Sequence, residues 1–513
     1  MQVFETVLAL LLGATILSTF ARRFNIAYPT LIAIGGALLA FIPGLPRLEL
    51  PPDLILALFV APVLLDAAYD ASLRDLRRNW LSISSLVIVA VVATTAAVAF
   101  AARWLIPDMP WAAAIALGAL LAPPDAVAAL AVLKHVDPPH RIRVVLEGES
   151  LLNDASSLLI YRLAVGAMAA GSFSASEAAP MFALVFFGSV VAGWLLAFPA
   201  NWLMGHIHDA PSSVIIQFVF MFGVWIGAEH LHLSGVVTIV VFGLTLARKN
   251  VAPMPAHLRV PSFAIWETVT VVLNVLAFAL IGLQLGPILE ALDTNERVRY
   301  FGAALLILVV VIVVRLAWLL THHSIATVTH RLTGGRTDDG IGQPPTTKDA
   351  LVVGWSGMRG IVTLAAAMAL PADFPYRDFI QLTAFVVVLG TLVIQGLTLK
   401  PLLRFLDLPK DSVVEDELKL AREASLKAAI ATLDADGTPA AEYLKHEYEH
   451  ALTVARDGGD PRDTHKNVLR LKLVTAGRKA IDDLRNSGAI GDTAFRRAEE
   501  ELDQVELSTR IGD

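Results

Sequence analysis

Apolar stretches separated by short polar loops follow one another from the start of the chain to about residue 410. Crossing a bilayer as an α-helix takes about 20 mostly apolar residues. Thirteen stretches are of that order: residues 3–20, 27–43, 54–70, 80–104, 111–133, 142–169, 180–205, 212–230, 233–247, 262–286, 299–328, 350–370 and 378–405. The pattern predicts an all-α polytopic membrane protein with about 13 transmembrane helices. The first stretch carries Glu5 in place of a basic leader, so we expect it to be a retained span.

Lysine and arginine are divided unequally between alternate loops, and this predicts the orientation of the spans. Short cytoplasmic loops are enriched in these residues. One set of loops is rich in them, with Arg22, Arg74 and Arg141 among its members. The alternate loops hold only Arg47, Arg103, Arg297, Arg299 and Arg377. We therefore expect the N-terminus outside and the C-terminus in the cytoplasm of a multi-pass cell-membrane protein.

Helix breakers fall at matching places in the two halves of the membrane region. If the first six and last six spans are repeats, they enter the membrane from opposite sides, because seven crossings separate their starts. Inverted repeats are typical of secondary transporters, whose sites lie where discontinuous helices meet. Pro123 and Pro124 interrupt the fifth span, and Gly354, Gly357 and Gly360 interrupt the twelfth. These breaks predict discontinuous crossing helices; the alternative is a pair of kinked packing helices.

Composition supports a membrane protein and excludes several kinds of site. Hydrophobic residues make up 56% of the 513 and charged residues 17%, against roughly 25% charged in soluble domains. The chain has no cysteine, which excludes disulfides and thiol–metal chemistry. The formal charge of −7 includes no basic block, so no nucleic-acid partner is expected. We expect no cofactor and no enzymatic reaction.

Ionisable residues within spans are the candidates for function, because each costs about 2.5–3.5 kcal/mol on insertion scales. Ser150 and Asp154 are four residues apart and share one helical face, while Glu149 and Asn153 form an adjacent stripe. Hydroxyl and carboxylate oxygens are hard ligands suited to a small hard cation. Asp154 as a helix cap at the membrane edge is the alternative. The stripe predicts a cation or proton site.

Three further groups complete the candidate site. The broken fifth span would add Asp125 and freed backbone carbonyls. Asp66 either belongs to the site or is merely solvated at the end of its span. A charged Glu149 needs a cationic partner, for which Arg359 in the twelfth span is the natural candidate. We expect Arg315 to be structural, either snorkelling or pairing with a carboxylate such as Glu267.

Several segments together resemble a known family. Residues 121–127 (LAPPDAV), 147–156 (EGESLLNDAS) and 356–371 (SGMRGIVTLAAAMALP) occur in the order found in monovalent cation–proton antiporters of the NhaP and NHE type, and 233–248 and 265–285 are similar as well. The resemblance implies a thirteen-helix antiporter fold, commonly a homodimer. It implies exchange of Na⁺ or Li⁺ for H⁺ by alternating access, serving pH homeostasis. Exchange of K⁺ for H⁺ is the runner-up.

The resemblance also implies roles for individual residues. Asp154 would hold either the proton or the cation, with Ser150 as a ligand and Asn153 steadying the site. An Asn-Asp pair is similar to the form associated with electroneutral one-for-one exchange. Glu149 and Arg359 match a buried ion pair of the family.

Two departures from the family pattern bear on ion selectivity. The family usually has Thr-Asp-Pro in the unwound helix, whereas this chain has Pro124, Asp125 and Ala126. Any ligand from Pro124 is therefore a backbone carbonyl. Asp66 stands where the family usually has Glu, and its shorter side chain makes a direct reach to the ion doubtful.

The chain changes character near its end, which predicts a transmembrane antiporter domain over 1–409 and a helical cytoplasmic domain over 410–513. The second region is charged, and both a regulatory role and a dimerising or solubilising role are open for it. Two other functions compete with antiport. An intramembrane aspartyl protease would pair two buried aspartates such as Asp125 and Asp154, but nothing resembles a peptide-binding edge. A channel fits poorly with inverted repeats around a single midplane carboxylate.

Overall fold

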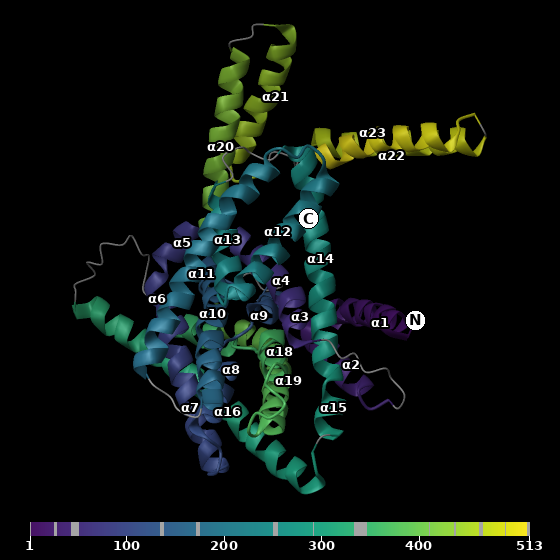
Figure 1. Cartoon of the computed structure of the whole chain (residues 1–513). Coiled ribbons are helices and arrows are strands. Elements are labelled where there is room, and N and C mark those ends of the chain that lie inside the picture. The colour runs from purple at the N-terminus through teal and green to yellow at the C-terminus, as the bar shows by residue number, and fades with distance from the viewer. Residues whose placement is uncertain are drawn as a thin grey trace. The chain divides into compact units, whose positions relative to one another are not determined.

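A computed structural model gives the arrangement of the chain (Figure 1). It describes residues 2–24, 28–42, 51–133, 138–170, 175–249, 255–290, 292–332, 346–409, 411–434, 438–460, 465–487 and 489–509. The described residues form helices and contain no β-strand. They divide into two compact units, Met1–Lys410 and Asp411–Asp513. The predicted domain boundary lies between residues 409 and 410.

The helices of the first unit follow the apolar stretches of the sequence. They are α1 Gln2–Phe24, α2 Tyr28–Leu39, α3 Pro52–Ile55, η1 Leu56–Val60, α4 Ala61–Asp70, α5 Leu73–Arg78, α6 Trp80–Ser84, η2 Ser85–Ala90, α7 Val91–Leu105, α8 Trp111–Leu121, α9 Ala126–Leu133, α10 His140–Ala170, α11 Ala175–Met204, α12 Ala210–His230, α13 Gly235–Lys249, α14 Ala256–Leu283, α15 Leu285–Glu290, α16 Thr294–Leu332, α17 Thr347–Trp355, α18 Ile361–Met368 and α19 Arg377–Leu406.

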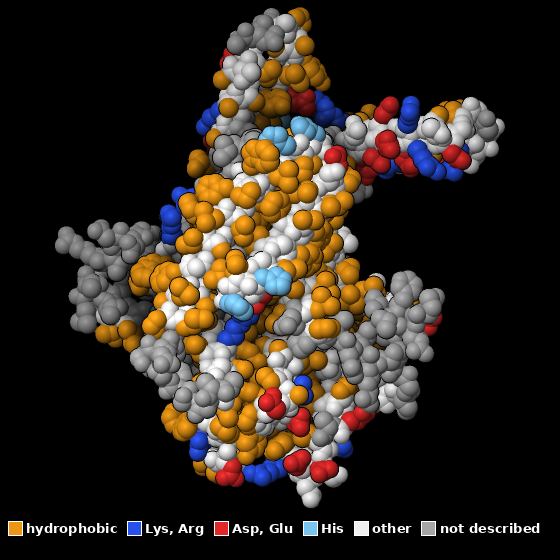
Figure 2. All heavy atoms as spheres, in the orientation of Figure 1, with side chains coloured by type: hydrophobic (Ala, Val, Ile, Leu, Met, Phe, Trp, Pro, Cys, Tyr) orange, Lys and Arg blue, Asp and Glu red, His pale blue; other side chains and the backbone are white. Residues whose placement is uncertain are grey.

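Six helical segments among the described residues are long and apolar enough to cross a membrane. They are Trp80–Leu105, Pro180–Met204, Ala210–His230, Ala256–Glu290, Thr294–Ile325 and Arg377–Leu406. Shorter apolar helices occupy Leu8–Ala21, Tyr28–Leu39, Trp111–Leu121 and Gly235–Arg248. Large apolar side chains such as Phe100, Trp104 and Phe187 are exposed, and hydrophobic side chains cover much of the face in Figure 2. Such a surface suits lipid rather than water, so the chain is a multi-pass membrane protein.

The helices of the first unit pack as two bundles. In the crossing bundle, α7, α8, α10, α16, α17 and α19 pack on one another, and α9 and α18 pack against α19. In the flanking bundle, α1, α2, α4, α11, α12, α13 and α14 pack on one another, with η1 against α4. The crossing bundle contains both interrupted spans.

Sequence chemistry explains where these two spans are interrupted. Helix α8 ends at Leu121, two residues before Pro123. Pro123 and Pro124 lack a backbone N–H and disfavour helix in the residue that precedes them. After the break, α9 begins at Ala126. In the other span, α17 begins in a capping box of Thr346 and Asp349. It ends at Trp355, and Ser356 to Gly360 separate it from α18.

The second unit consists of two helical hairpins. Helices α20 (Val413–Asp434) and α21 (Pro439–Arg456) pack on each other, as do α22 (His465–Asn486) and α23 (Asp492–Thr509). Both hairpins carry ion pairs: Glu423 pairs with Lys427 within α20, and Arg485 of α22 pairs with Asp492 of α23. These pairs are exposed, so each contributes little to stability.

Candidate functional site

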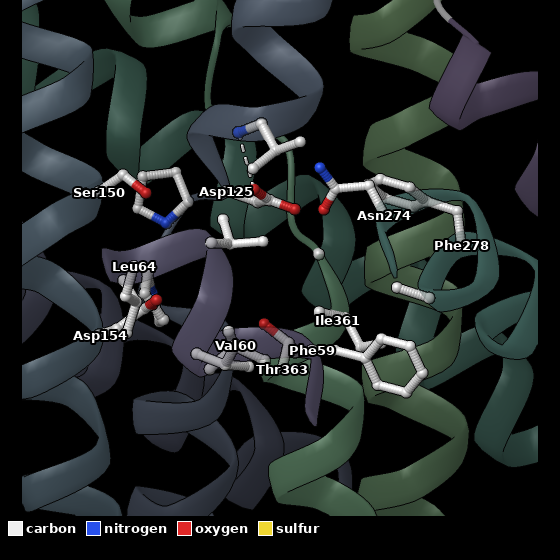
Figure 3. Close-up of a pocket in the computed structure, with 17 residues that line it drawn as sticks. Phe59, Val60, Leu64, Asp125, Ser150, Asp154, Asn274, Phe278, Ile361 and Thr363 are labelled. Carbon is white, nitrogen blue, oxygen red and sulfur yellow. Dashed lines mark hydrogen bonds between the residues drawn. The ribbon is translucent and has the colours of Figure 1, made fainter. Parts of the chain in front are cut away.

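A cavity of about 50 Å³ lies among the interrupted helices (Figure 3). Its walls come from η1, α4, α9, α10, α14, α18 and the break between α8 and α9. Most lining residues are apolar. The exceptions are Asp125, Ser150, Asp154, Asn274 and Thr363. The cavity therefore offers oxygen atoms within an apolar surround, which is the usual composition of a small-ligand site.

Helix α10 brings two of the predicted residues to this cavity. Ser150 and Asp154 are one turn apart, so both side chains lie on the face that lines it. Asp154 is 7% exposed. Apolar residues such as Leu151 and Leu158 lie before and after Asp154 on α10 and pack in the protein interior. A carboxylate and a hydroxyl thus share one wall, as the spacing predicts.

Asp125 lies where the two interrupted spans cross. Its backbone N–H donates to the carbonyl oxygen of Met358 over 2.6 Å, which joins the two breaks. Its Oδ1 accepts a hydrogen bond of 2.9 Å from the N–H of Val127 and so caps the start of α9. Its Oδ2 packs against Gly360, where any Cβ would overlap the carboxyl group. A glycine is therefore required at position 360 for Asp125 to take this place.

Glu149 pairs with Arg315, and the predicted pairing with Arg359 is wrong. The two guanidinium nitrogens Nη1 and Nη2 of Arg315 donate to the two carboxylate oxygens of Glu149 over 2.5 and 2.8 Å. Both residues are almost fully buried. Arg315 reaches Glu149 from α16 because Gly357 has no side chain in its way. The suggested partner Glu267 is exposed on α14.

Arg359 instead satisfies the carbonyl groups freed by the breaks. Its guanidinium donates to the carbonyl oxygens of Leu121 (3.0 Å), Ala122 (3.5 Å) and Gly357. The last carbonyls of a helix have no intrahelical partner and carry the negative end of the helix dipole. Arg359 therefore caps α8. Arg315 does the same for α17 by donating to the carbonyl oxygens of Val353 and Gly354.

The remaining predicted residues take different places. Pro124 lines the cavity. Asn153 precedes Asp154 in the sequence, but its side-chain amide donates to Glu149 over 3.2 Å. Asn153 therefore adjoins the ion pair and not the cavity. Asp66, on α4, does not line the cavity, although Val63 and Leu64 of the same helix do. The Asp66 carboxylate is thus not part of the wall that Asp154 and Ser150 form.

Two cavity residues were missed by reasoning from the sequence. Asn274 and Thr363 lie within apolar spans but do not ionise, so a search for buried charges passes over them. The signal that finds Asn274 is its isolation, because it is an amide within an otherwise apolar run of α14. Thr363 follows the break before α18, at the start of a helix that faces the cavity.

Comparison with known proteins identifies the family. A family model described as "Sodium/hydrogen exchanger, transmembrane" matches residues 7–405. This chain belongs to the sodium/hydrogen exchanger family. An uncharacterised Na⁺/H⁺ exchanger of Mycobacterium tuberculosis is 31% identical over 98% of this chain and 95% of its own length. A sodium, potassium, lithium and rubidium/H⁺ antiporter of Bacillus subtilis is 27% identical over 99% of this chain and 78% of its own length.

The fold of this exchanger is also similar to a solved structure. The sodium proton antiporter MjNhaP1 of Methanocaldococcus jannaschii superposes with a TM-score of 0.60 and 18% identity, over 79% of this chain and 99% of that one. The match confirms an all-helical antiporter fold for this exchanger.

Proposed function

We propose that this exchanger moves Na⁺, or Li⁺, in one direction and H⁺ in the other by alternating access across the cell membrane. The observation that carries the proposal is the cavity holding Asp154 and Ser150 at the crossing of two interrupted helices. One buried carboxylate cannot hold a proton and a cation at once. Release of one is therefore required for binding of the other, which couples the two fluxes.

We propose further that the exchange is electroneutral, with one Na⁺ for one H⁺. Position 153 is an amide that donates to Glu149 and does not titrate. The charges of Glu149 and Arg315 compensate each other. Asp125 engages Oδ1 in capping α9, and its role is to shape the site. The charge that changes during the cycle then belongs to Asp154.

Exchange of K⁺ for H⁺ is the second candidate. The Bacillus subtilis relative is named as an antiporter of sodium, potassium, lithium and rubidium, which supports a broader cation range for a chain of this kind. The mechanism would be the same, because a carboxylate and a hydroxyl bind either ion.

The proposed architecture has thirteen crossings in two inverted six-helix repeats. It is supported by the matching positions of the two interruptions and by helix in each of the thirteen apolar stretches. The N-terminus would lie outside and the C-terminus in the cytoplasm, from the arginine and lysine bias of the loops. A homodimer, with residues 411–513 as a cytoplasmic domain, and a role in pH homeostasis complete the proposal.

Everted vesicles with a dye that reports their internal pH provide the test. Adding Na⁺, Li⁺ or K⁺ to acidified vesicles should release protons from the wild type. Asp154→Asn should abolish this release while the protein remains folded and present in the membrane, because an amide cannot exchange a proton. Asp416→Asn, in the second unit, is the matched control and should retain the wild-type rate. Cation-dependent release from Asp154→Asn at the wild-type rate would refute the proposed mechanism.

A further inference from the structure

The two bundles contribute unequally to the cavity. The crossing bundle supplies the polar residues Asp125, Ser150, Asp154 and Thr363. The flanking bundle supplies Phe59, Val60, Val63, Leu64, Ala277 and Phe278, all apolar, and one amide, Asn274. Among the described lining residues, Asn274 is thus the polar group that faces the site from the opposite wall.

Helix α14 presents Asn274 to the cavity together with Ala277 and Phe278, at the spacing of one helical face. Figure 3 shows its side-chain amide pointing toward the carboxyl group of Asp125. The amide makes no hydrogen bond to any residue that the structure describes. Asn274 is half-buried, so its amide oxygen is open to a ligand that enters the cavity.

The donor set of the crossing bundle leaves room for another oxygen. Pro124 has no side-chain oxygen, and Asp66 is not among the residues that line the cavity. Asp125 already engages Oδ1 at the start of α9. An amide oxygen is a hard, neutral ligand. It would complete the coordination of a cation without adding a charge, so the balance of one cation against one proton is kept.

We propose that Asn274 is a ligand of the transported cation and that it favours Na⁺ over K⁺. The inference rests on the proposed exchange at Asp154. Because Asn274 and Asp154 stand on different bundles, the ion is held between two walls. Their separation would then limit the size of the ion, and fit to ion size is one proposed source of selectivity between Na⁺ and K⁺.

Apparent KM values for Na⁺ and K⁺ in everted vesicles test this role. Asn274→Leu keeps the approximate volume and removes the oxygen. It should raise the KM for Na⁺ about tenfold, equivalent to 1.4 kcal/mol, and the KM for K⁺ by less than threefold. Thr268→Val, on the exposed side of α14, is the matched control and should leave both values within twofold. An unchanged ratio of the two KM values in Asn274→Leu would overturn the proposal.

A binding measurement separates a ligand from a structural residue. Na⁺ should raise the Tm of the purified wild type above its value in choline, because a bound ligand stabilises the folded state. Asn274→Leu should lose most of this rise, and retention of the full rise would contradict the assignment. Wild-type vesicles without cation-dependent proton release would instead refute the exchange itself.

If Asn274→Leu does not fold, Asn274→Asp is the variant that tests whether residue 274 contacts the cation. The aspartate keeps an oxygen in place and adds a negative charge at alkaline pH. It should lower the KM for Na⁺ about tenfold at pH 9 and make transport sensitive to the membrane potential. A KM within twofold of the wild type at that pH would exclude contact between residue 274 and the ion.

Discussion

Asp154 is the residue on which the proposed coupling depends, and competition at its carboxylate has a measurable result. At low pH protons displace the cation, and at high pH too few protons are available for the return step. A tenfold rise in Na⁺ should therefore shift the acidic limb of the rate profile to lower pH by at most about one unit.

The measurement is a series of pH profiles at several Na⁺ concentrations, with and without residues 411–513. Simple competition requires the acidic limb to move with Na⁺ in both proteins. A limb that ignores Na⁺ and moves only when the second unit is deleted would place pH sensing in that unit instead.

At Gly360, the addition of a single methyl group should strongly lower both the exchange rate and the stability of the fold. A methyl group at this position would overlap the carboxyl group of Asp125, which capping of α9 holds in place. We expect Gly360→Ala to lower the exchange rate at least tenfold and to destabilise the fold by about 1–3 kcal/mol.

Gly302→Ala provides the matched control for this prediction. Gly302 lies on α16 with open space around it, so its methyl group should leave both rate and Tm close to those of the wild type. Equal rates in the two alanine variants would show that the crossing tolerates a side chain at position 360.

At the scale of elements, two arginines cap two interrupted helices, and one of them also neutralises Glu149. Removing one member of a buried ion pair costs about 3–5 kcal/mol. We expect Glu149→Gln and Arg315→Met each to lower the Tm of the purified protein strongly. The double variant should recover part of the loss, because no unpaired charge is left buried.

The same cycle with Arg359 is the comparison. Arg359 bonds backbone carbonyls and not Glu149, so the losses from Glu149→Gln and Arg359→Met should be closer to additive. A larger interaction free energy between Glu149 and Arg359 than between Glu149 and Arg315 would show that Arg359 is the partner of Glu149, as the sequence predicts.

The sequence predicts local features of these elements well and long-range contacts poorly. Apolar runs predict helices, and Pro123 and Pro124 predict a break, because both effects act within a few residues. Arg315 and Arg359 lie in different apolar spans, and their local sequence does not reveal which one reaches Glu149. That choice depends on how α16 packs beside α17 and on the space left by Gly357. Asn274 could not be predicted for a related reason. It lines the cavity because α14 packs opposite α10, and the local sequence does not reveal that packing.

At the scale of the whole molecule, an ion pair between described residues joins the two bundles. Arg162, on α10, donates from Nη2 to both carboxylate oxygens of Glu229, on α12, over 2.8 and 2.9 Å. Glu229 also accepts from the N–H of Gly235 at the start of α13. If the bundles move against each other during transport, this contact has to break.

Arg162→Gln should therefore shift the equilibrium between the conformation in which Arg162 and Glu229 are paired and the one in which the bundles have moved apart at this contact. The pair is partly exposed, and such pairs contribute about 0.2–1 kcal/mol, so we expect a change in exchange rate of no more than about fivefold. Arg103→Gln, whose guanidinium contacts Pro107 and Trp111 within the crossing bundle, should change the rate by less. Accessibility of a single cysteine introduced at Thr363, in this chain without native cysteine, would report the shift. Identical labelling in both variants would exclude a gating role for the pair.

The contacts of Arg359 also set an order of events during biosynthesis. The carbonyl oxygen of Leu121 accepts a hydrogen bond from the side chain of Arg359, 238 residues later in the chain. The N–H of Asp125 donates to the carbonyl oxygen of Met358, which is also made much later. Until the ribosome has supplied those partners, the newly inserted segment of α8 and α9 holds unpaired peptide groups at membrane depth, where each is costly. The first half of the chain, made alone, therefore lacks these two hydrogen-bond partners. A nascent protein released before residue 359 should be an early substrate of membrane quality control.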